Sequence, residues 1–193
     1  MRADALALLR DWQPPDQAQA SLAQAYLGFL LARDDATARS CEPGHLTASA
    51  VVLSADRAST LLTLHPRVGR WLQLGGHCEA GDTSIAGAAL REANEESGIA
   101  GLWIHPQPIR LDVHPITCSL GAPTRHFDVR FAVIAPPEAQ PVISDESDDL
   151  GWWPVDALPQ PIGAGVAATV ASAVKSDSLP TPQHPSVVPH PLR

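Results

Sequence analysis

The chain has 193 residues, of which 45% are apolar, and this suits one folded domain with appendages. It carries 13 Lys and Arg against 21 Asp and Glu, a net charge of −8, which disfavours nucleic acid and anionic membranes as partners. No apolar run reaches the roughly 20 residues that span a bilayer, and the N-terminus lacks a signal-peptide pattern. The three cysteines form no zinc pattern. We therefore expect a cytoplasmic protein with reduced thiols.

The first part of the chain predicts two helices and a hairpin. Helices are expected at residues 3–12 and 16–33, because a Pro-Pro pair ends the first and Asp16 can cap the second. The second helix has apolar residues at helical spacing, so one of its faces must cover other parts of the protein. After a linker, residues 46–54 predict a strand, and the segment from Thr60 predicts its hairpin partner.

The rest of the chain predicts a mixture of helices and strands. A helix is expected at 84–97, strands at 101–104, 109–113 and 126–134, and a helix at 162–175. Between the last two, an acidic loop leads into a short strand and a turn. Residues 176–193 are rich in proline and predict disorder or an extended tail. We divide the chain into a helical extension (1–40), a main domain (41–175) and this tail (176–193).

The helix at 84–97 places three carboxylates on one face. At 100° per residue, Glu92, Glu95 and Glu96 fall within an arc of about 100°. Two carboxylates about 6 Å apart repel by roughly 3 kcal/mol at an effective dielectric of 20, so a cation between them is favoured. Oxygen ligands of this kind suit Mg²⁺ or Mn²⁺. An exposed, salt-bridged helix is the simpler alternative, but it does not account for the glycines upstream or for Arg91.

These residues resemble the Nudix box, the signature of the Nudix hydrolase family. The pattern is G-x5-E-x7-R-E-U-x-E-E-x-G-U, where U is aliphatic, and residues 76–99 match it with Gly76 at its start and "REANEESGI" at its end. Ala93 stands at the first aliphatic position. One residue is inserted, so the mid-box acid falls on Asp82 when counted from the glycine and on Thr83 when counted back from Arg91.

The resemblance implies a fold and a chemistry. The fold would be an α/β/α sandwich of the α+β class, with a mixed sheet, to which this chain adds its N-terminal helical pair. Family members hydrolyse a nucleoside diphosphate linked to another group, with water activated by a divalent metal. Mg²⁺ or Mn²⁺ would be the cofactor, and the implied ligands are the carbonyl of Gly75 and the carboxylates of Glu92, Glu95 and Glu96. Arg91 would orient them as an ion-pair partner. The general base stays open between a helix glutamate and Glu146, outside the box, for which a solvated acidic loop is the alternative.

Candidate substrate-binding residues lie on a predicted strand and next to the glycines. If "HFDVRF" is a strand, His126, Asp128 and Arg130 share one face, which lines a substrate cleft or else faces solvent as an ordinary edge. His77, directly after the glycines, either contacts phosphate or only occupies the loop. The tryptophans Trp103, Trp152 and Trp153 could stack on a base, but core packing is the default expectation for them.

Alternatives remain within and outside the hydrolases. A non-catalytic nucleotide-sensing module is the main one, although such modules usually lack box glutamates that this chain retains. The isomerase branch of the family should carry further motifs that are not found here. The expected partner is a small nucleotide-type substrate. The two N-terminal helices either cover the active site or build a homodimer interface.

Overall fold

The computed structural model describes residues 1–117, 121, 123–144 and 147–176. Its helices are α1 (Arg2–Asp11), α2 (Gln17–Ala32), α3 (Ile85–Ser97) and α4 (Val166–Val174). Its strands are β1 (His45–Leu53), β2 (Ser59–His65), β3 (Arg70–Leu72), β4 (Leu74–His77), β5 (Trp103–Ile104), β6 (Arg110–Thr117), β7 (Pro123–Ile134) and β8 (Asp149–Pro154). Among these residues, no helix is both long enough and apolar enough to cross a membrane.

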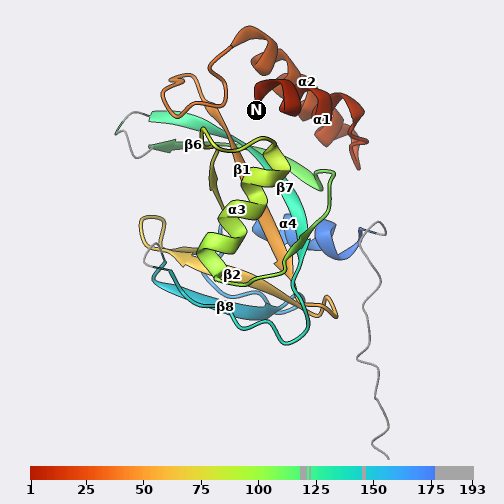
Figure 1. Cartoon of the computed structure of the whole chain (residues 1–193), viewed down its shortest axis with the longest axis vertical. Coiled ribbons are helices and arrows are strands. Elements are labelled where there is room, and N and C mark those ends of the chain that lie inside the picture. The colour runs from red at the N-terminus through yellow and green to blue at the C-terminus, as the bar shows by residue number, and fades with distance from the viewer. Residues whose placement is uncertain (118–120, 122, 145–146, 177–193) are drawn as a thin grey trace, which may run out of the picture.

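The strands form one mixed sheet with β1 and β7 at its centre. The strand order is β3-β2-β1-β7-β5, with β4 paired to β1, β6 to β7 and β8 to β2. The β1–β7 pair is parallel and every other pair is antiparallel. Helix α3 lies on one side of this centre and α4 on the other (Figure 1). The predicted α+β class, with helices on both sides of a mixed sheet, is therefore confirmed.

Most predicted elements are present, with shifts that have local causes. The strand expected at 109–113 extends to Thr117 and includes Pro115. Proline has no backbone N–H to donate, and an outer strand tolerates this because one of its edges has no partner strand. The helix expected from 162 begins at Val166, after Gly165 in the left-handed region with φ of 79°. The segment 101–104 contributes only Trp103–Ile104 as a strand. The tail at 177–193 lies outside the described residues.

The two faces of the sheet differ in polarity. On the α3 side, Leu46, Ala48 and Phe131 pack against Ile85 and Ala88 in one apolar cluster. On the α4 side, the far half of β1 and β7 is apolar and packs against α4. The near half of that same side, at the beginning of β1 and β7, carries polar and charged residues instead. We refer to this part, with Thr47, Ser49, Asp128 and Arg130, as the polar half of the sheet.

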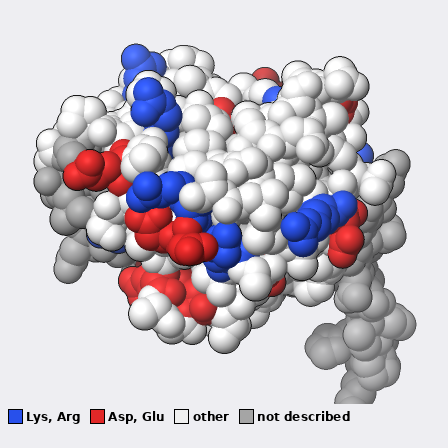
Figure 2. Space-filling view, turned by 90° about the horizontal axis from the view of Figure 1, so that it is seen from above, with Lys and Arg blue, Asp and Glu red and all other residues white. Residues whose placement is uncertain are grey.

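The two predicted N-terminal helices are confirmed, and they pack into the same core as α3. Leu9, Trp12 and Leu30 are buried in the cluster that includes Ile85. The Asp4 carboxylate also accepts a hydrogen bond from the backbone N–H of Ile85, at 2.8 Å. Helix α1 thus supplies an N-terminal cap to α3. Seen from the α1–α2 end, charged side chains lie in small mixed groups between broad uncharged areas (Figure 2), so this face has no extended basic patch.

Candidate active site

Two glycines bring the end of β4 close to both β1 and α3. Gly75 has a φ of 149°, and a Cβ there would lie 2.6 Å from the backbone of Ser49. A Cβ on Gly76 would lie 2.5 Å from an oxygen of the Glu92 carboxylate. No larger residue fits at either position without movement of its neighbour. The glycines therefore let the Glu92 carboxylate lie directly against the β4 backbone.

Helix α3 is capped at both ends. Ser84 is the N-cap, and its hydroxyl accepts a hydrogen bond from the N–H of Gly87 at 3.0 Å. Gly98 ends the helix in the left-handed region with φ of 64°. Between these caps, Ala88, Ala89 and Ala93 are fully buried against the sheet. These small residues allow the close approach that keeps the glutamate-bearing face next to β4.

Arg91 is the centre of the acidic cluster. Its guanidinium lies 3.0 Å from Asp82, 3.1 Å from Glu92 and 2.8 Å from Glu95, and it donates to the carbonyl of His77 at 2.9 Å. The predicted Arg91–Glu95 pair is therefore present, together with three further ion pairs, to Asp82, Glu92 and, at 4.0 Å, Glu79. Hydrogen bonding to Asp82 is the largest influence that raises the pKa of Arg91, so it is a permanent cation among these carboxylates.

Asp82, and not Thr83, is the loop residue in closest contact with Arg91, at 3.0 Å, while the Glu79 carboxylate lies 4.0 Å away. Both oxygens of the Asp82 carboxylate face Arg91, and one also accepts from the backbone N–H of Glu79 at 2.7 Å. The hydrogen bond from Arg91 lowers the pKa of Asp82 below its ordinary value of 3.8, against the opposing effect of burial. With Asp82 as the mid-box acid, eight residues separate it from Arg91 where the pattern has seven, so the extra residue lies between these two. It leaves the bidentate contact with Arg91 intact.

The three helix glutamates fit a hard divalent cation. Glu92 is 12% exposed, Glu95 is 59% exposed, and Glu96 is half-buried. Carboxylate oxygens are the donors that Mg²⁺ and Mn²⁺ prefer, and the lack of a Cβ on Gly76 keeps the Glu92 carboxylate beside the β4 backbone. Glu146 lies outside the described residues.

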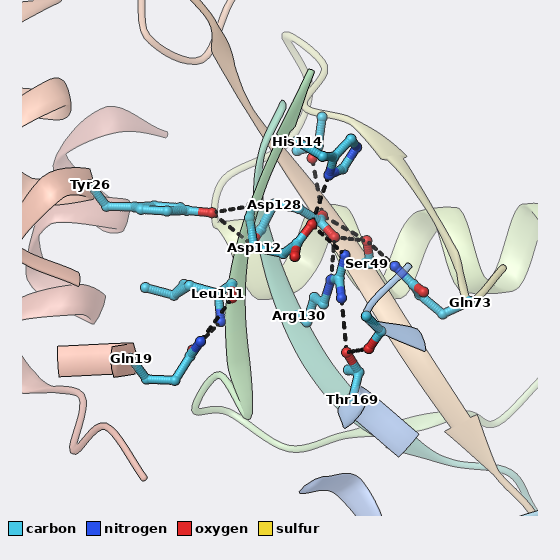
Figure 3. Close-up of polar contacts among 12 residues, drawn as sticks. Gln19, Tyr26, Ser49, Gln73, Leu111, Asp112, His114, Asp128, Arg130 and Thr169 are labelled. Atoms are coloured by element: carbon cyan, nitrogen blue, oxygen red, sulfur yellow. Dashed lines mark hydrogen bonds and ion pairs between the residues drawn. The ribbon is translucent and has the colours of Figure 1, made fainter. Parts of the chain in front are cut away.

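Asp128 and Arg130 form a buried ionic network on the polar half of the sheet (Figure 3). They are only 2% and 3% exposed. Arg130 lies 2.8 Å from both Asp128 and Asp112 and donates to the hydroxyl of Thr169 at 2.9 Å. Asp128 also accepts from the hydroxyl of Ser49 at 2.6 Å. These two residues are therefore not part of a solvent-facing edge.

Asp112 and His114 form the accessible border of this network. Their side chains are 32% and 40% exposed, and they lie 2.8 Å apart. Burial acts to raise the pKa of Asp112, but the hydrogen bond with His114 and the charge of Arg130 lower it overall. Asp112 is therefore anionic near neutral pH. No sequence pattern singled out either residue, because only the pairing of β6 with β7 brings them beside Asp128 and His126.

Helix α2 is joined to the same network by two polar side chains. The hydroxyl of Tyr26 lies 2.6 Å from the carbonyl of Asp112 and 2.9 Å from that of Asp128 (Figure 3). Burial, and then the charge of Asp128, raises the pKa of Tyr26, so the phenol stays protonated. Gln19 exchanges two hydrogen bonds with the backbone of Leu111 and pairs with it as another strand would. The helix therefore supports the strands that carry the network.

His77 and His126 lie together at one end of the polar half, with His45 between their strands. The ring centroids of the three histidines are 4.9 to 5.1 Å apart. Burial is the main cause that lowers the pKa of His77 to about 3 and that of His126 to about 4. These imidazoles are therefore neutral at pH 7. His45 gave no signal in the sequence, since it stands alone at the start of a strand.

The three tryptophans differ in burial. Trp153 packs against Trp71 in the cluster under α4, and Trp152 lies beside the core on the α3 side, as core packing predicts. Trp103 is 42% exposed, so core packing is wrong for it. It lies on β5, an outer strand of the sheet.

Comparisons with known proteins agree with this geometry. A family model described as a NUDIX domain matches residues 43–172, which is more than half of the chain. The dihydroneopterin triphosphate pyrophosphohydrolase of E. coli is 22% identical, with a TM-score of 0.54 over 67% of this chain and 94% of that one. The NUDIX domain of Shewanella oneidensis NrtR, complexed with ADP ribose, is 22% identical, with a TM-score of 0.54 over 76% and 95%. A NUDIX-family hydrolase from Clostridium perfringens is 22% identical, with a TM-score of 0.50 over 67% and 95%.

A search of curated protein sequences finds no match to this chain. The structural neighbours establish the fold, and the family model covers the whole segment from the start of the sheet to α4. Within that segment the glycines, Arg91 and the helix glutamates occupy the positions of the box. The chain is therefore a member of the Nudix hydrolase family.

Proposed function

We propose that this protein is a Mg²⁺- or Mn²⁺-dependent pyrophosphohydrolase that cleaves a nucleoside diphosphate linked to another moiety. The observation that carries the proposal is the cluster around Arg91, in which Asp82, Glu92 and Glu95 all lie within 3.1 Å of one guanidinium. An exposed helix with ordinary salt bridges would not require Gly76, whose lack of a Cβ makes room for the Glu92 carboxylate. The retained carboxylates favour turnover over a sensing role without catalysis.

Each box residue has a proposed role in this reaction. Glu92, Glu95, Glu96 and the carbonyl of Gly75 are the proposed metal ligands. A metal bound there would neutralise the pyrophosphate and lower the pKa of a coordinated water, which matters for a protein with a net charge of −8. Arg91 is a positioning residue, because it holds Glu92 and Glu95 on one side and Asp82 on the other. The general base is proposed to be a helix glutamate or Glu146.

The polar half of the sheet is the proposed substrate-binding surface. Asp128 and Arg130 form an ion pair with each other, so their proposed role is to fix the partly exposed Asp112 for contact with a polar group of the substrate. His126 and His77 are the candidates at the box end of this surface, where neutral imidazoles can donate to phosphate oxygens. Two carboxylates stand against one guanidinium in the network. The Asp112 part of the surface therefore favours a hydrogen-bond donor of the substrate, whereas the His126 and His77 end is the part proposed to contact its phosphate.

The cellular setting is part of the same proposal. We expect a small nucleotide-type substrate, no nucleic-acid partner and a cytoplasmic location. The two N-terminal helices bury apolar side chains in the core. A homodimer built through their outer faces stays a prediction.

The first experiment is a phosphate-release screen with Mg²⁺ or Mn²⁺. The panel would contain nucleoside triphosphates, oxidised triphosphates, ADP-ribose, dihydroneopterin triphosphate, nucleotide sugars, NADH, coenzyme A and dinucleoside polyphosphates. The expected result is one preferred class of substrate and no turnover in excess EDTA. Glu96→Gln should lower kcat at least about 100-fold, which corresponds to ~2.7 kcal/mol of lost transition-state stabilisation.

A matched control separates chemistry from general damage. Glu138→Gln makes the same replacement at an exposed residue in the loop after β7, and it should retain wild-type kcat. Turnover that survives EDTA, or a Glu96→Gln variant as active as Glu138→Gln, would overturn the mechanism. Silence across the panel, with nucleotide binding shown by calorimetry, would establish the sensing module in its place.

A further inference from the structure

Three histidines from three neighbouring strands converge outside the box carboxylates. His45 on β1 stands opposite His126 on the parallel strand β7, and His77 on β4 stands opposite Thr47, two residues along β1. One ring nitrogen from each residue lies within 4.8 Å of the other two. In the described parts of the chain, this is the one group of three or more His, Cys, Asp or Glu residues whose ligand atoms converge so closely.

The environment of the cluster favours metal-binding imidazoles. His45 is fully buried, and its ring has a hydrogen bond with the backbone of Cys41, of the kind that orients metal-ligating histidines from their second nitrogen. The Nε2 atom of His126 is buried and has no hydrogen-bond partner among the described residues. A buried polar atom of this kind is costly unless a ligand satisfies it. Packing alone does not explain why three imidazoles meet at this point.

We propose that His45, His77 and His126 form a binding site for a divalent transition metal, Zn²⁺ in the first instance. A zinc ion bound tetrahedrally at 2.0–2.1 Å places its nitrogen ligands about 3.4 Å apart, so small side-chain rotations would close this cluster on the ion. Three protein ligands leave the fourth position to water. Neutral imidazoles are the form that binds metal, and the low pKa of His126 keeps it neutral far below pH 7.

The histidine cluster differs from the box in the metal it prefers. Imidazole nitrogen suits Zn²⁺, whereas the carboxylates of Glu92, Glu95 and Glu96 suit Mg²⁺ or Mn²⁺. The two sites are nevertheless adjacent, because the carbonyl of His77 accepts a hydrogen bond from Arg91. Zinc would also join the beginnings of β1 and β7 to the end of β4, and it should stabilise the folded state.

The experiment measures binding of the metal alone. The full chain would be stripped with chelator, placed in excess Mg²⁺ to occupy the carboxylates, and titrated with Zn²⁺ by calorimetry. A parallel titration would follow the visible absorption of Co²⁺, whose band intensity reports tetrahedral nitrogen coordination. We expect one equivalent of Zn²⁺ to bind despite the Mg²⁺ and to raise Tm. His126→Gln and His77→Gln should each weaken Zn²⁺ binding by at least ~100-fold. Loss of a residue that only supports a metal ligand weakens binding by ~10–100-fold, so a larger loss identifies a ligand.

Two control variants make the result specific. His105→Gln removes a histidine whose ring contacts Trp103 on an outer strand, and Glu96→Gln removes a box carboxylate; both should bind Zn²⁺ as wild type does. Arg39→Gln should tighten binding several-fold, because the charge of Arg39 acts on the cluster and repels a dication. No zinc binding in excess Mg²⁺, or equal binding by wild type and both histidine variants, would overturn the proposal. The Tm of each metal-free variant would confirm that it folds.

Discussion

Replacement of Arg130 by methionine should destabilise the protein strongly. Arg130 is 3% exposed and donates to Asp128, Asp112 and Thr169 at 2.8 to 2.9 Å. Methionine fills much of the volume but leaves the buried Asp128 carboxylate without its cation. Breaking a buried pair in this way costs about 3–5 kcal/mol. Because Asp128 keeps its hydrogen bond from Ser49, we expect the lower end, about 3 kcal/mol.

Thermal and urea denaturation would measure this loss of stability. For a chain of this size, about 3 kcal/mol corresponds to a fall in Tm of ~6–12 °C. Arg125→Met, at an exposed position on the same strand, is the matched control and should change stability by less than about 0.5 kcal/mol. The double variant Arg130→Met/Asp128→Asn removes the stranded charge and should recover part of the loss. A loss below about 1 kcal/mol, or a double variant less stable than Arg130→Met, would refute the reasoning.

Three further predictions follow from contacts described above. Tyr26→Phe keeps the ring but removes the hydroxyl shared by two carbonyls, so the free energy of unfolding in urea should fall by about 1–2 kcal/mol; no change would show that the bonds are not needed. Asp4→Ala removes the cap on Ile85, so unfolding should become easier by about 1 kcal/mol and hydrogen exchange in the first turn of α3 should accelerate. Asp82→Asn should be less stable than wild type above the ordinary carboxyl pKa of 3.8, and the difference should vanish as the pH falls through the lower pKa that Arg91 gives Asp82 in the folded protein. A difference that stays constant through that acid range would contradict the ion pair.

Helices and strands whose ends are set by neighbouring residues were predicted well from the sequence. The helix expected at 84–97 is found at Ile85–Ser97, between the Ser84 cap and Gly98. The order of the strands was not predictable in the same way. The parallel pairing of β1 with β7, and the position of β8 next to β2, depend on contacts between distant segments that no short-range pattern records.

The residues of the candidate site also differ in how far they could be predicted. The box residues lie in one loop and one helix, so their spacing alone indicated that Glu92 and Glu95 share a face. The alternation in β7 correctly placed Asp128 and Arg130 together, but it did not reveal that both are buried. His45 could not be connected to His126 from the sequence, because only the register of the parallel pair brings them together.

The parallel β1–β7 pair has a consequence for how the chain folds. The hydrogen bond between Thr47 and Asp128 joins residues 81 positions apart, and that between Tyr26 and Asp128 spans 102. During synthesis, α1, α2 and β1 therefore emerge long before the strand on which they pack. Their apolar surfaces stay only partly covered, by α3 and the earlier strands, until β7 has left the ribosome, and long-range pairing of this kind is slow. We expect refolding in milliseconds to seconds, with aggregation competing until the central pair has formed.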